Sequence, residues 1–338
     1  MSRTTTALAL TEVGGPFEMR QIQLDTIRPD EALIEIHATG ICHTDISFAN
    51  GTLPGKAGAI LGHEGGGVVL QVGPDVTNVA PGDKVLLSFS HCETCGPCKS
   101  GHPAYCHDFN QRNFPGARAD GTAALKSLDG SEPLFSSFFG QSSFARHTLV
   151  HKSCLVKTGA GAVMNTLDVK EGSTLAVFGA GSVGMSAIMA ARLELAKRLG
   201  ATHGVLGSGN VVEEIRKLCP PVGVDFAVDC TGSTKVIENM IESLGTRGKA
   251  ATVGAPGFGA KVSVDVMSHL TSGRSYMGCC EGDSLPSQFV PHLIELHAQG
   301  KLPLDEMITV YDMKDYQKAL DDTHAGKALK AVLVWRQS

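Results

Sequence analysis

Hydrophobic and polar positions follow two different patterns along the chain. In the first 150 residues or so, short apolar runs stand between Gly and Pro residues, and they predict strands at 33–38, 67–73 and 83–87. Short strands with this punctuation favour a partly open barrel. From about residue 158, strand patterns alternate with helix patterns. That alternation predicts a parallel sheet covered by helices.

The second region begins with a buried strand at 174–178 and continues with a helix over Val211–Leu218. Asn210 is placed to cap this helix, and its apolar face would hold Val211, Ile215 and Leu218. Further segments complete the alternation: strands at 224–229, 249–254, 276–280 and 331–335, a helix over 234–244 between Ser233 and Gly245, a helix that ends near 300, and a helix over 315–322.

A glycine-rich turn follows the strand at 174–178. Gly179, Gly181 and Gly184 have G-x-G-x-x-G spacing and lead into a helix, which predicts a site for the pyrophosphate of a dinucleotide. Such a fold normally has a second strand that ends in an acidic residue about 20 residues later. Here the helix at 186–192 runs directly into 193–200, so both that strand and the acidic ribose ligand are missing.

Composition limits the class of protein. The chain has 338 residues, enough for two domains, with 42% hydrophobic and 19% charged residues and a net charge of −5. This charge gives no reason to expect nucleic acid or an acidic membrane as a partner, and no apolar run approaches the ~18 residues of a membrane span. Ten cysteines without a secretory signal indicate metal binding or catalysis and a cytoplasmic location.

Four cysteines form the strongest motif. They have C-x2-C-x2-C-x7-C spacing within a Gly- and Pro-rich loop, at Cys92, Cys95, Cys98 and Cys106. Four thiolates on one short loop are typical of a structural zinc site. An iron–sulfur cluster uses similar spacing but has no other support here. The remaining alternative is four unrelated buried cysteines.

A second candidate metal site pairs Cys42 with His63 and Glu64. A catalytic zinc needs three protein ligands and one open position. Alone, a cysteine and a histidine this far apart are more often a core thiol and an ordinary surface imidazole. The residues around them change that balance.

Together these motifs closely resemble the zinc-dependent medium-chain alcohol dehydrogenases, and most of all the aryl- or benzyl-alcohol branch. The resemblance extends over nearly the whole chain and rests on residues 40–45, 62–64, the cysteine loop, 158–161, 179–184, 281–284 and 326–330. It implies a GroES-like catalytic domain at 1–157, a Rossmann coenzyme domain at 158–280 and a return to the catalytic domain at 281–338. It also implies NAD-dependent interconversion of an alcohol and its aldehyde by a homodimer or homotetramer.

The resemblance assigns roles around the catalytic zinc. Cys42 and His63 would be ligands, and Glu64 would be a carboxylate able to approach the metal. Asp45 would orient His63 through its second ring nitrogen. Thr44 would pass the substrate proton outward, and Ser47 stands where many relatives carry a relay histidine.

The same resemblance assigns the coenzyme and substrate contacts. His43 and Lys330 would contact the pyrophosphate together with the glycine loop. The nicotinamide ring would lie against Thr158, Val183 and Val253. Phe138 and Phe139 correspond to substrate-pocket positions, where flat apolar faces suit an aromatic alcohol; simple core packing is an equally good interpretation of both rings.

Two segments of the family pattern are missing. One normally lies before Thr158 and carries the third zinc ligand, a cysteine between glycines; the other is the strand with the acidic ribose ligand. Each gap looks like a clean excision, as an alternative or mispredicted splice would leave. Glu64 or Cys154 could replace the lost zinc ligand, although a cysteine next to strand residues is expected to point into the core. Without such a replacement we expect one zinc per chain and poor oxidation of benzyl alcohol.

Two other functions stay open. A zinc-free medium-chain quinone or enoyl reductase would share the fold, but the cysteine loop and the Cys42–His63 pair argue against it. A non-catalytic isoform that keeps only the structural zinc is favoured by the two gaps.

Overall fold

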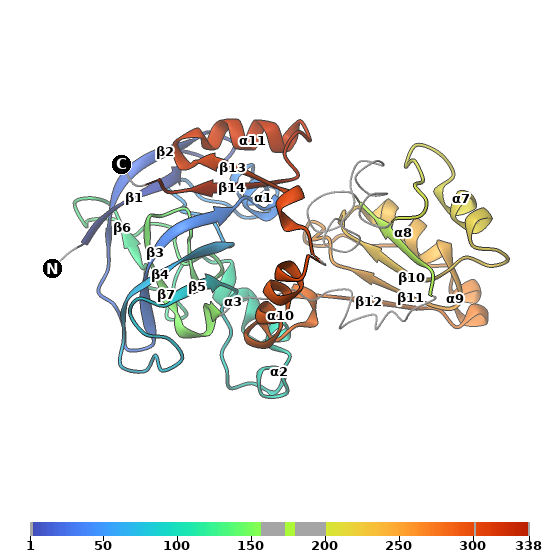
Figure 1. Ribbon diagram of the computed structural model, residues 1–338, viewed down its shortest axis with the longest axis horizontal. Helices are drawn as coiled ribbons and strands as arrows, with labels where there is room; N and C mark the ends of the chain where they lie inside the picture. Colours follow the sequence, from blue (N-terminus) through green and yellow to red (C-terminus); the bar gives the residue numbers. More distant parts are fainter. Residues whose placement is uncertain (1–2, 157–172, 180–200, 301, 337–338) are drawn as a thin grey trace. The chain divides into compact units, whose positions relative to one another are not determined.

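The computed structural model describes residues 3–156, 173–179, 201–300 and 302–336. The chain divides into two compact units, Met1–Ala160 with Leu285–Ser338, and Gly161–Ser284 (Figure 1). The Thr158 contact and the helix at 186–192 lie outside the described residues.

The first unit is built on β-sheets. Its larger sheet has the order β13-β14-β3-β4-β5-β8, and β7 pairs with β3. These strands are β13 (Ile308–Asp312), β14 (Lys330–Val334), β3 (Glu31–Gly40), β4 (Gly65–Val72), β5 (Lys84–Leu87), β8 (Leu155–Val156) and β7 (His147–His151). The smaller sheet is antiparallel and contains β1 (Arg3–Leu10), β2 (Phe17–Leu24) and β6 (Leu125–Lys126).

Alternating side chains of β3 form the centre of the barrel core. Ala32, Ile34 and Ile36 are fully buried and pack with Val69 and Val150 from the neighbouring strands. Period-two alternation places such residues on one face of a strand, so the strands predicted at 33–38, 67–73 and 83–87 are confirmed within β3, β4 and β5.

Short helices surround this barrel. Figure 1 shows α11 beside β13 and β14. The α-helices of the unit are α1 (His43–Ala49), α2 (Gly96–Lys99), α3 (Phe109–Asn113), α10 (Pro286–Ala298) and α11 (Tyr316–His324). Single 3₁₀ turns occupy η1 (Pro103–Tyr105), η2 (Phe138–Gly140), η3 (Lys152–Cys154), η5 (Leu304–Glu306) and η6 (Met313–Asp315).

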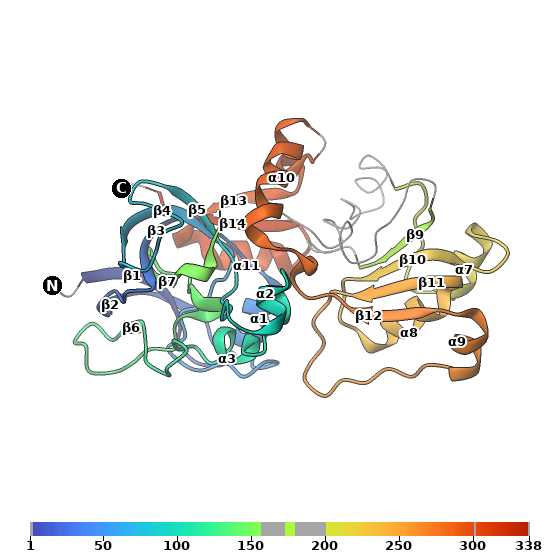
Figure 2. The ribbon, with the colours of Figure 1, turned by 90° about the horizontal axis from the view of Figure 1, so that it is seen from below.

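The second unit contains a parallel sheet in the order β12-β11-β10-β9. Its elements are β9 (Leu175–Phe178), α7 (Val211–Leu218), β10 (Val224–Asp229), α8 (Thr234–Ser243), β11 (Leu244–Thr252), α9 (Val266–Ser272), β12 (Ser275–Gly278) and the turn η4 (Glu281–Asp283). Figure 2 shows α8 along one face of this sheet. Ile237 and Met240 of α8 are buried there against Ala227 and Ala250.

The helix predictions in this unit are confirmed in outline and wrong in three details. The Asn210 side chain caps α7 by accepting from Glu213 N at 3.2 Å. Leu218 is exposed, and Val212 with Ile215 forms the buried face instead. The Ser233 side chain makes no cap hydrogen bond, and α8 ends at Ser243, one residue before the predicted end, where the chain passes directly into β11.

The described residues contain no second strand next to the glycine loop. Residues 201–210 form no strand, and β9 is an edge strand within the described part of the sheet. The gap predicted after the glycine loop, between Arg192 and Leu193, lies outside the described residues.

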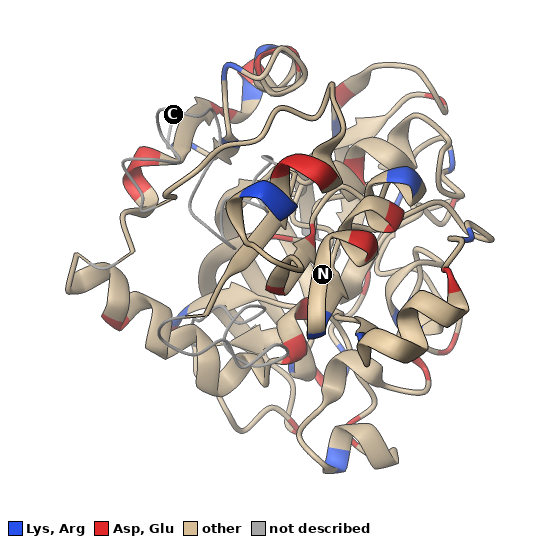
Figure 3. Ribbon diagram, turned by 90° about the vertical axis from the view of Figure 1, so that its right-hand side faces the viewer, with Lys and Arg blue, Asp and Glu red and all other residues tan. Residues whose placement is uncertain are grey.

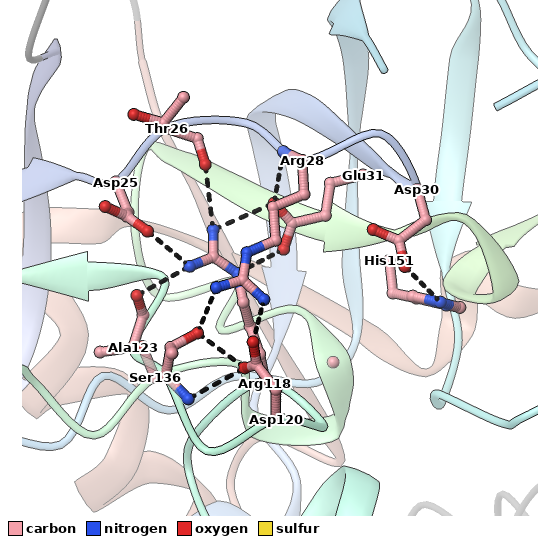
Figure 4. A network of polar contacts seen from close by, with 12 residues as sticks. Asp25, Thr26, Arg28, Asp30, Glu31, Arg118, Asp120, Ala123, Ser136 and His151 are labelled. Atoms are coloured by element: carbon pink, nitrogen blue, oxygen red, sulfur yellow. Dashed lines mark hydrogen bonds and ion pairs between the residues drawn. The ribbon is translucent and has the colours of Figure 1, made fainter. Parts of the chain in front are cut away.

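A buried network of charges joins the loop at 114–136 to the barrel (Figure 4). Arg118 donates from Nε and Nη2 to both oxygens of Glu31, at 2.6 and 3.0 Å, and from Nη1 to Asp25 at 2.7 Å. Its other two N–H groups reach the carbonyl oxygens of Thr26 and Ala123. All five donors of the guanidinium are therefore paired, as a buried arginine requires.

Acidic and basic residues are interspersed along the chain in the view of Figure 3. Among the described residues, no helix is both long enough and apolar enough to cross a membrane.

Candidate metal centres and active site

The start of α1 places Cys42. Cys42 is the N-cap of α1, and the Asp45 side chain three residues later accepts from the backbone N–H of Cys42 at 3.0 Å. A carboxylate at this position also interacts favourably with the positive end of the helix dipole. The sequence Cys-His-Thr-Asp therefore fixes the backbone that carries the thiol.

Asp45 also holds His63. Its other oxygen, Oδ1, accepts from Gly62 N at 2.9 Å and lies 3.1 Å from His63 Nδ1. With Nδ1 bonded to a carboxylate, Nε2 is the ring nitrogen left to act as a ligand. Burial lowers the pKa of His63, but the charge and hydrogen bond of Asp45 outweigh burial and raise that pKa well above its ordinary value.

The third member of the group is Glu64. The ligand atoms of Cys42, His63 and Glu64 all lie within 4.8 Å of one another. Glu64 Oε2 also forms an ion pair with Lys330 Nζ. A Cβ atom on Gly40 would lie 2.0 Å from that same carboxylate oxygen, so this position of Glu64 requires glycine at 40. One thiolate, one imidazole and one carboxylate fit a catalytic zinc with an open position.

Glu64 and Lys330 shift each other's pKa. Burial raises the pKa of Glu64, but the charges of Lys330 and His63 and the hydrogen bonds of Lys330 and Cys42 together outweigh burial, and the net shift is downward. Burial lowers the pKa of Lys330, but the charge and hydrogen bond of Glu64, together with the charges of Cys42 and Asp45, outweigh burial and raise that pKa. Both groups are therefore charged near neutral pH.

Two phenylalanine rings cover His63. The ring of Phe139 is stacked on His63 with centroids 4.5 Å apart, and Phe138 meets it edge-on at 5.4 Å. Four further rings extend this cluster and were not found from the sequence: Phe48, Phe109, Phe114 and Phe135. From the sequence, Phe138 and Phe139 suited a substrate pocket and simple core packing equally well. The structure buries both and also places them against His63.

The four cysteines of the loop converge. The Sγ atoms of Cys92, Cys95, Cys98 and Cys106 all lie within 4.8 Å of one another. A hydrogen bond from Thr94 lowers the pKa of Cys92 to about 5, whereas burial raises the pKa of Cys98 to about 12. A tetrahedral cation would keep all four as thiolates, and this donor set fits structural zinc.

Cys154 lies elsewhere. It is fully buried in the barrel core, with Sγ 3.8 Å from the carbonyl oxygens of Phe139 and Gly140. Burial raises the pKa of its thiol to about 12. Within the described part of the chain, Cys154 belongs to neither group of candidate ligands. The structure gives no support to Cys154 as the third ligand.

The other predicted site residues are distributed over both units. In the first unit, Thr44 Oγ1 is 3.6 Å from Cys42 Sγ, Ser47 lies within α1, and His43 is exposed at the start of α1. In the second unit, Gly179 follows β9 with φ of +105°, and Val253 follows β11. Gly181, Val183 and Gly184 lie outside the described residues.

Comparison with known proteins gives the family. Residues 28–160 match the alcohol dehydrogenase GroES-like domain, and residues 173–299 match the zinc-binding dehydrogenase family. The chain is 36% identical to a geraniol dehydrogenase of Castellaniella defragrans, with 97% of each chain covered. The chain belongs to the zinc-binding alcohol dehydrogenase family. This dehydrogenase is thus a member of a family of oxidoreductases that act on CH–OH groups, as the sequence motifs predicted.

Solved structures agree. The dehydrogenase is similar to an alcohol dehydrogenase zinc-binding domain protein from Burkholderia ambifaria, with a TM-score of 0.94, 40% identity and complete coverage of both chains. It is also similar to benzyl alcohol dehydrogenase from Acinetobacter calcoaceticus, with a TM-score of 0.92, 35% identity and coverage of 99% of this chain and 100% of the other. These similarities confirm the predicted GroES-like barrel and Rossmann-type parallel sheet.

The alignment with the geraniol dehydrogenase also bears on the missing segments. It extends over 367 positions, which exceeds the 338 residues of the chain by 29. At least 29 of its positions therefore have no residue in this dehydrogenase. This difference agrees with the prediction that family segments are missing.

Proposed function

We propose that this dehydrogenase uses NAD to interconvert a primary alcohol, aromatic or allylic, and its aldehyde at a metal ion held by Cys42, His63 and Glu64. The observation that carries the proposal is the mutual approach of these three ligand atoms within 4.8 Å, under the rings of Phe138 and Phe139. Glu64 takes the place of the family cysteine that the sequence lacks.

Each residue of the site would have a separate role in the reaction. A zinc ion held by these residues would supply Lewis acidity, and a nicotinamide coenzyme would supply the hydride acceptor. Asp45 keeps the His63 ring in one tautomer and orientation. The Thr44 hydroxyl, 3.6 Å from the Cys42 thiol, would pass the alcohol proton outward.

The aromatic rings around His63 support the substrate class. Phe139, the less buried of the two rings against His63, would offer a flat apolar surface to an aromatic or allylic substrate and help to keep water from the reacting carbon. The names of two similar proteins, a geraniol and a benzyl alcohol dehydrogenase, point to the same kind of alcohol.

A non-catalytic protein is the second candidate. It is favoured by the edge position of β9 in the described sheet and by the alignment positions without a residue in this chain. Such a protein would keep the metal at the cysteine loop and bind no second metal.

Metal analysis combined with turnover separates the candidates. We expect two zinc ions per chain after exhaustive dialysis, and NADH formation with benzyl alcohol or geraniol. Replacing Cys42 with Ser should remove one zinc and abolish turnover. Cys219→Ser, a matched change of a cysteine outside both groups, should retain both zinc ions and full turnover.

One zinc per chain without turnover would replace the proposal with the non-catalytic candidate. Turnover that persists in zinc-free protein would instead indicate a zinc-independent reductase.

A further inference from the structure

Gln141 lies at the point where the barrel holds the predicted ligands His63 and Glu64. Its side chain is fully buried, and it follows the turn that carries Phe138 and Phe139. Neither the motifs nor the family resemblance singled it out.

The amide of Gln141 brackets Glu64. Nε2 donates to the carbonyl oxygen of His63 at 2.8 Å, and Oε1 accepts from Gly65 N at 3.0 Å. The second N–H of Nε2 donates to Ser88 O at 3.0 Å. The partners also fix the orientation of the amide, because a flipped amide would place its oxygen against two carbonyl oxygens and its NH₂ against an N–H.

Through these bonds the side chain acts like a strand partner for residues 63–65. A backbone held on both sides of Glu64 has little freedom to rotate, so the directions of the His63 ring and the Glu64 carboxylate are set together. Gly65 allows this close approach: a Cβ atom there would lie 2.6 Å from Ser143 Cβ and 3.1 Å from Gln141 Oε1.

The loop that presents Gln141 is itself strained. Ser137, Phe139 and Ser142 all have positive φ angles, of 56°, 51° and 53°. Non-glycine residues keep such angles only where their surroundings hold them, and they gather at functional sites. Here Ser142 Oγ donates to Ile60 O at 2.6 Å and accepts from Phe138 N, which secures the loop.

We propose that Gln141 is a positioning residue for the metal centre: it fixes His63 and Glu64 at the separation from Cys42 that a metal ion needs. Asp45 orients the His63 ring from one side, and Gln141 fixes the backbone that carries both ligands from the other. The inference rests on the proposed metal ligands Cys42, His63 and Glu64. The role of Gln141 can nevertheless be refuted while these three ligands are upheld.

The test compares two isosteric changes of buried polar side chains in the full-length protein. Gln141→Met removes all three hydrogen bonds to residues 63, 65 and 88. Thr148→Val removes the hydroxyl that donates to Gln141 O and so weakens the same loop without touching residues 63–65. Zinc affinity is measured by competition with a chromophoric chelator, and the Cys42→Ser variant identifies the signal of the cysteine loop.

We expect Gln141→Met to weaken zinc at the Cys42 centre by about 10- to 100-fold, the range typical of residues that support metal ligands. Zinc at the cysteine loop should stay bound. Thr148→Val should change the affinity by less than about threefold, although its melting temperature falls. In cobalt-loaded protein, subtracting the spectrum of Cys42→Ser leaves the spectrum of the Cys42 centre. This difference spectrum should change in Gln141→Met and stay the same in Thr148→Val.

An affinity within threefold of wild type in Gln141→Met would overturn the inference, as would equal losses in both variants. A wild-type protein that binds zinc only at the cysteine loop would show instead that the proposed function is wrong, and the inference would fall with it. If Gln141→Met does not fold, Gln141→Asn keeps a polar amide in the cavity but is too short to reach all three partners. The same tenfold or larger loss is expected from it.

Discussion

Arg118 offers a sharp test of how the barrel is held together. Replacing it with Met keeps most of the side-chain volume and removes the guanidinium. Both Arg118 and Glu31 have side chains only 5–6% exposed, so the change leaves the Glu31 carboxylate buried without its bidentate partner. Breaking a buried pair in this way typically costs about 3–5 kcal/mol, because the remaining charge is uncompensated.

Urea unfolding followed by tryptophan fluorescence measures this cost. The chain has one tryptophan, Trp335, which packs against the barrel core and therefore reports on the first unit. We expect Arg118→Met to lower the free energy of unfolding by about 3–5 kcal/mol, or the melting temperature by roughly 6–20 °C for a unit of this size. Adding Glu31→Gln should restore part of the loss by removing the unpaired charge.

A surface pair provides the control. Arg20 and Glu18 are 3.1 Å apart, but their side chains are 48% and 57% exposed. Arg20→Met should therefore cost no more than about 1 kcal/mol. If Arg118→Met costs no more than this control, or if Glu31→Gln restores nothing, the reasoning about the buried charge is wrong.

The pH dependence of this difference has a defined sign. Burial raises the pKa of Asp25, but hydrogen bonds from Lys126 and Arg118 outweigh burial and lower it below 3.8. A depressed carboxylate pKa contributes stability that is present above the unfolded value and lost as pH falls through the folded one. Because Arg118→Met removes part of this contribution, the stability gap between variant and wild type should narrow as pH falls below about 4. A gap that widens there would contradict the assignment.

Three further predictions concern the proposed active site. Asp45→Asn should weaken zinc binding at the Cys42 centre by about 10- to 100-fold. The control is Asp229→Asn, at a buried aspartate that likewise accepts three hydrogen bonds, and it should leave zinc affinity unchanged. Equal loss of zinc in both variants would contradict the role of Asp45. Phe139→Leu should raise the KM for benzyl alcohol by about 2- to 12-fold, the equivalent of one aromatic contact, and Phe135→Leu, in the same cluster but without a ring contact to His63, should not. NADH should bind weakly because no acidic ribose ligand follows the glycine loop, and submicromolar binding in a fluorescence titration would refute this.

The sequence by itself determined the elements and the local metal motif. Strand and helix periodicity predict the boundaries of α7 and β10, because apolar residues recur along the sequence with the period of the element whose face they bury. The cysteine loop was also readable, because its four ligands lie within 15 residues and need only one local turn to meet. The end of α8 was also readable to within one residue, since the helix ends at Ser243, just before Leu244 and Gly245.

Only the tertiary structure distinguished Glu64 from Cys154 as the neighbour of Cys42 and His63. Cys42 and Glu64 are 22 positions apart, and the ion pair of Glu64 with Lys330 joins residues 266 positions apart. Spacing along a sequence does not encode such distances, since they arise when β3, β4 and β14 pair. Gln141 could not be predicted from the sequence for the same reason, since a lone glutamine belongs to no motif. Its proposed role comes from the two backbone groups that the fold places on either side of Glu64.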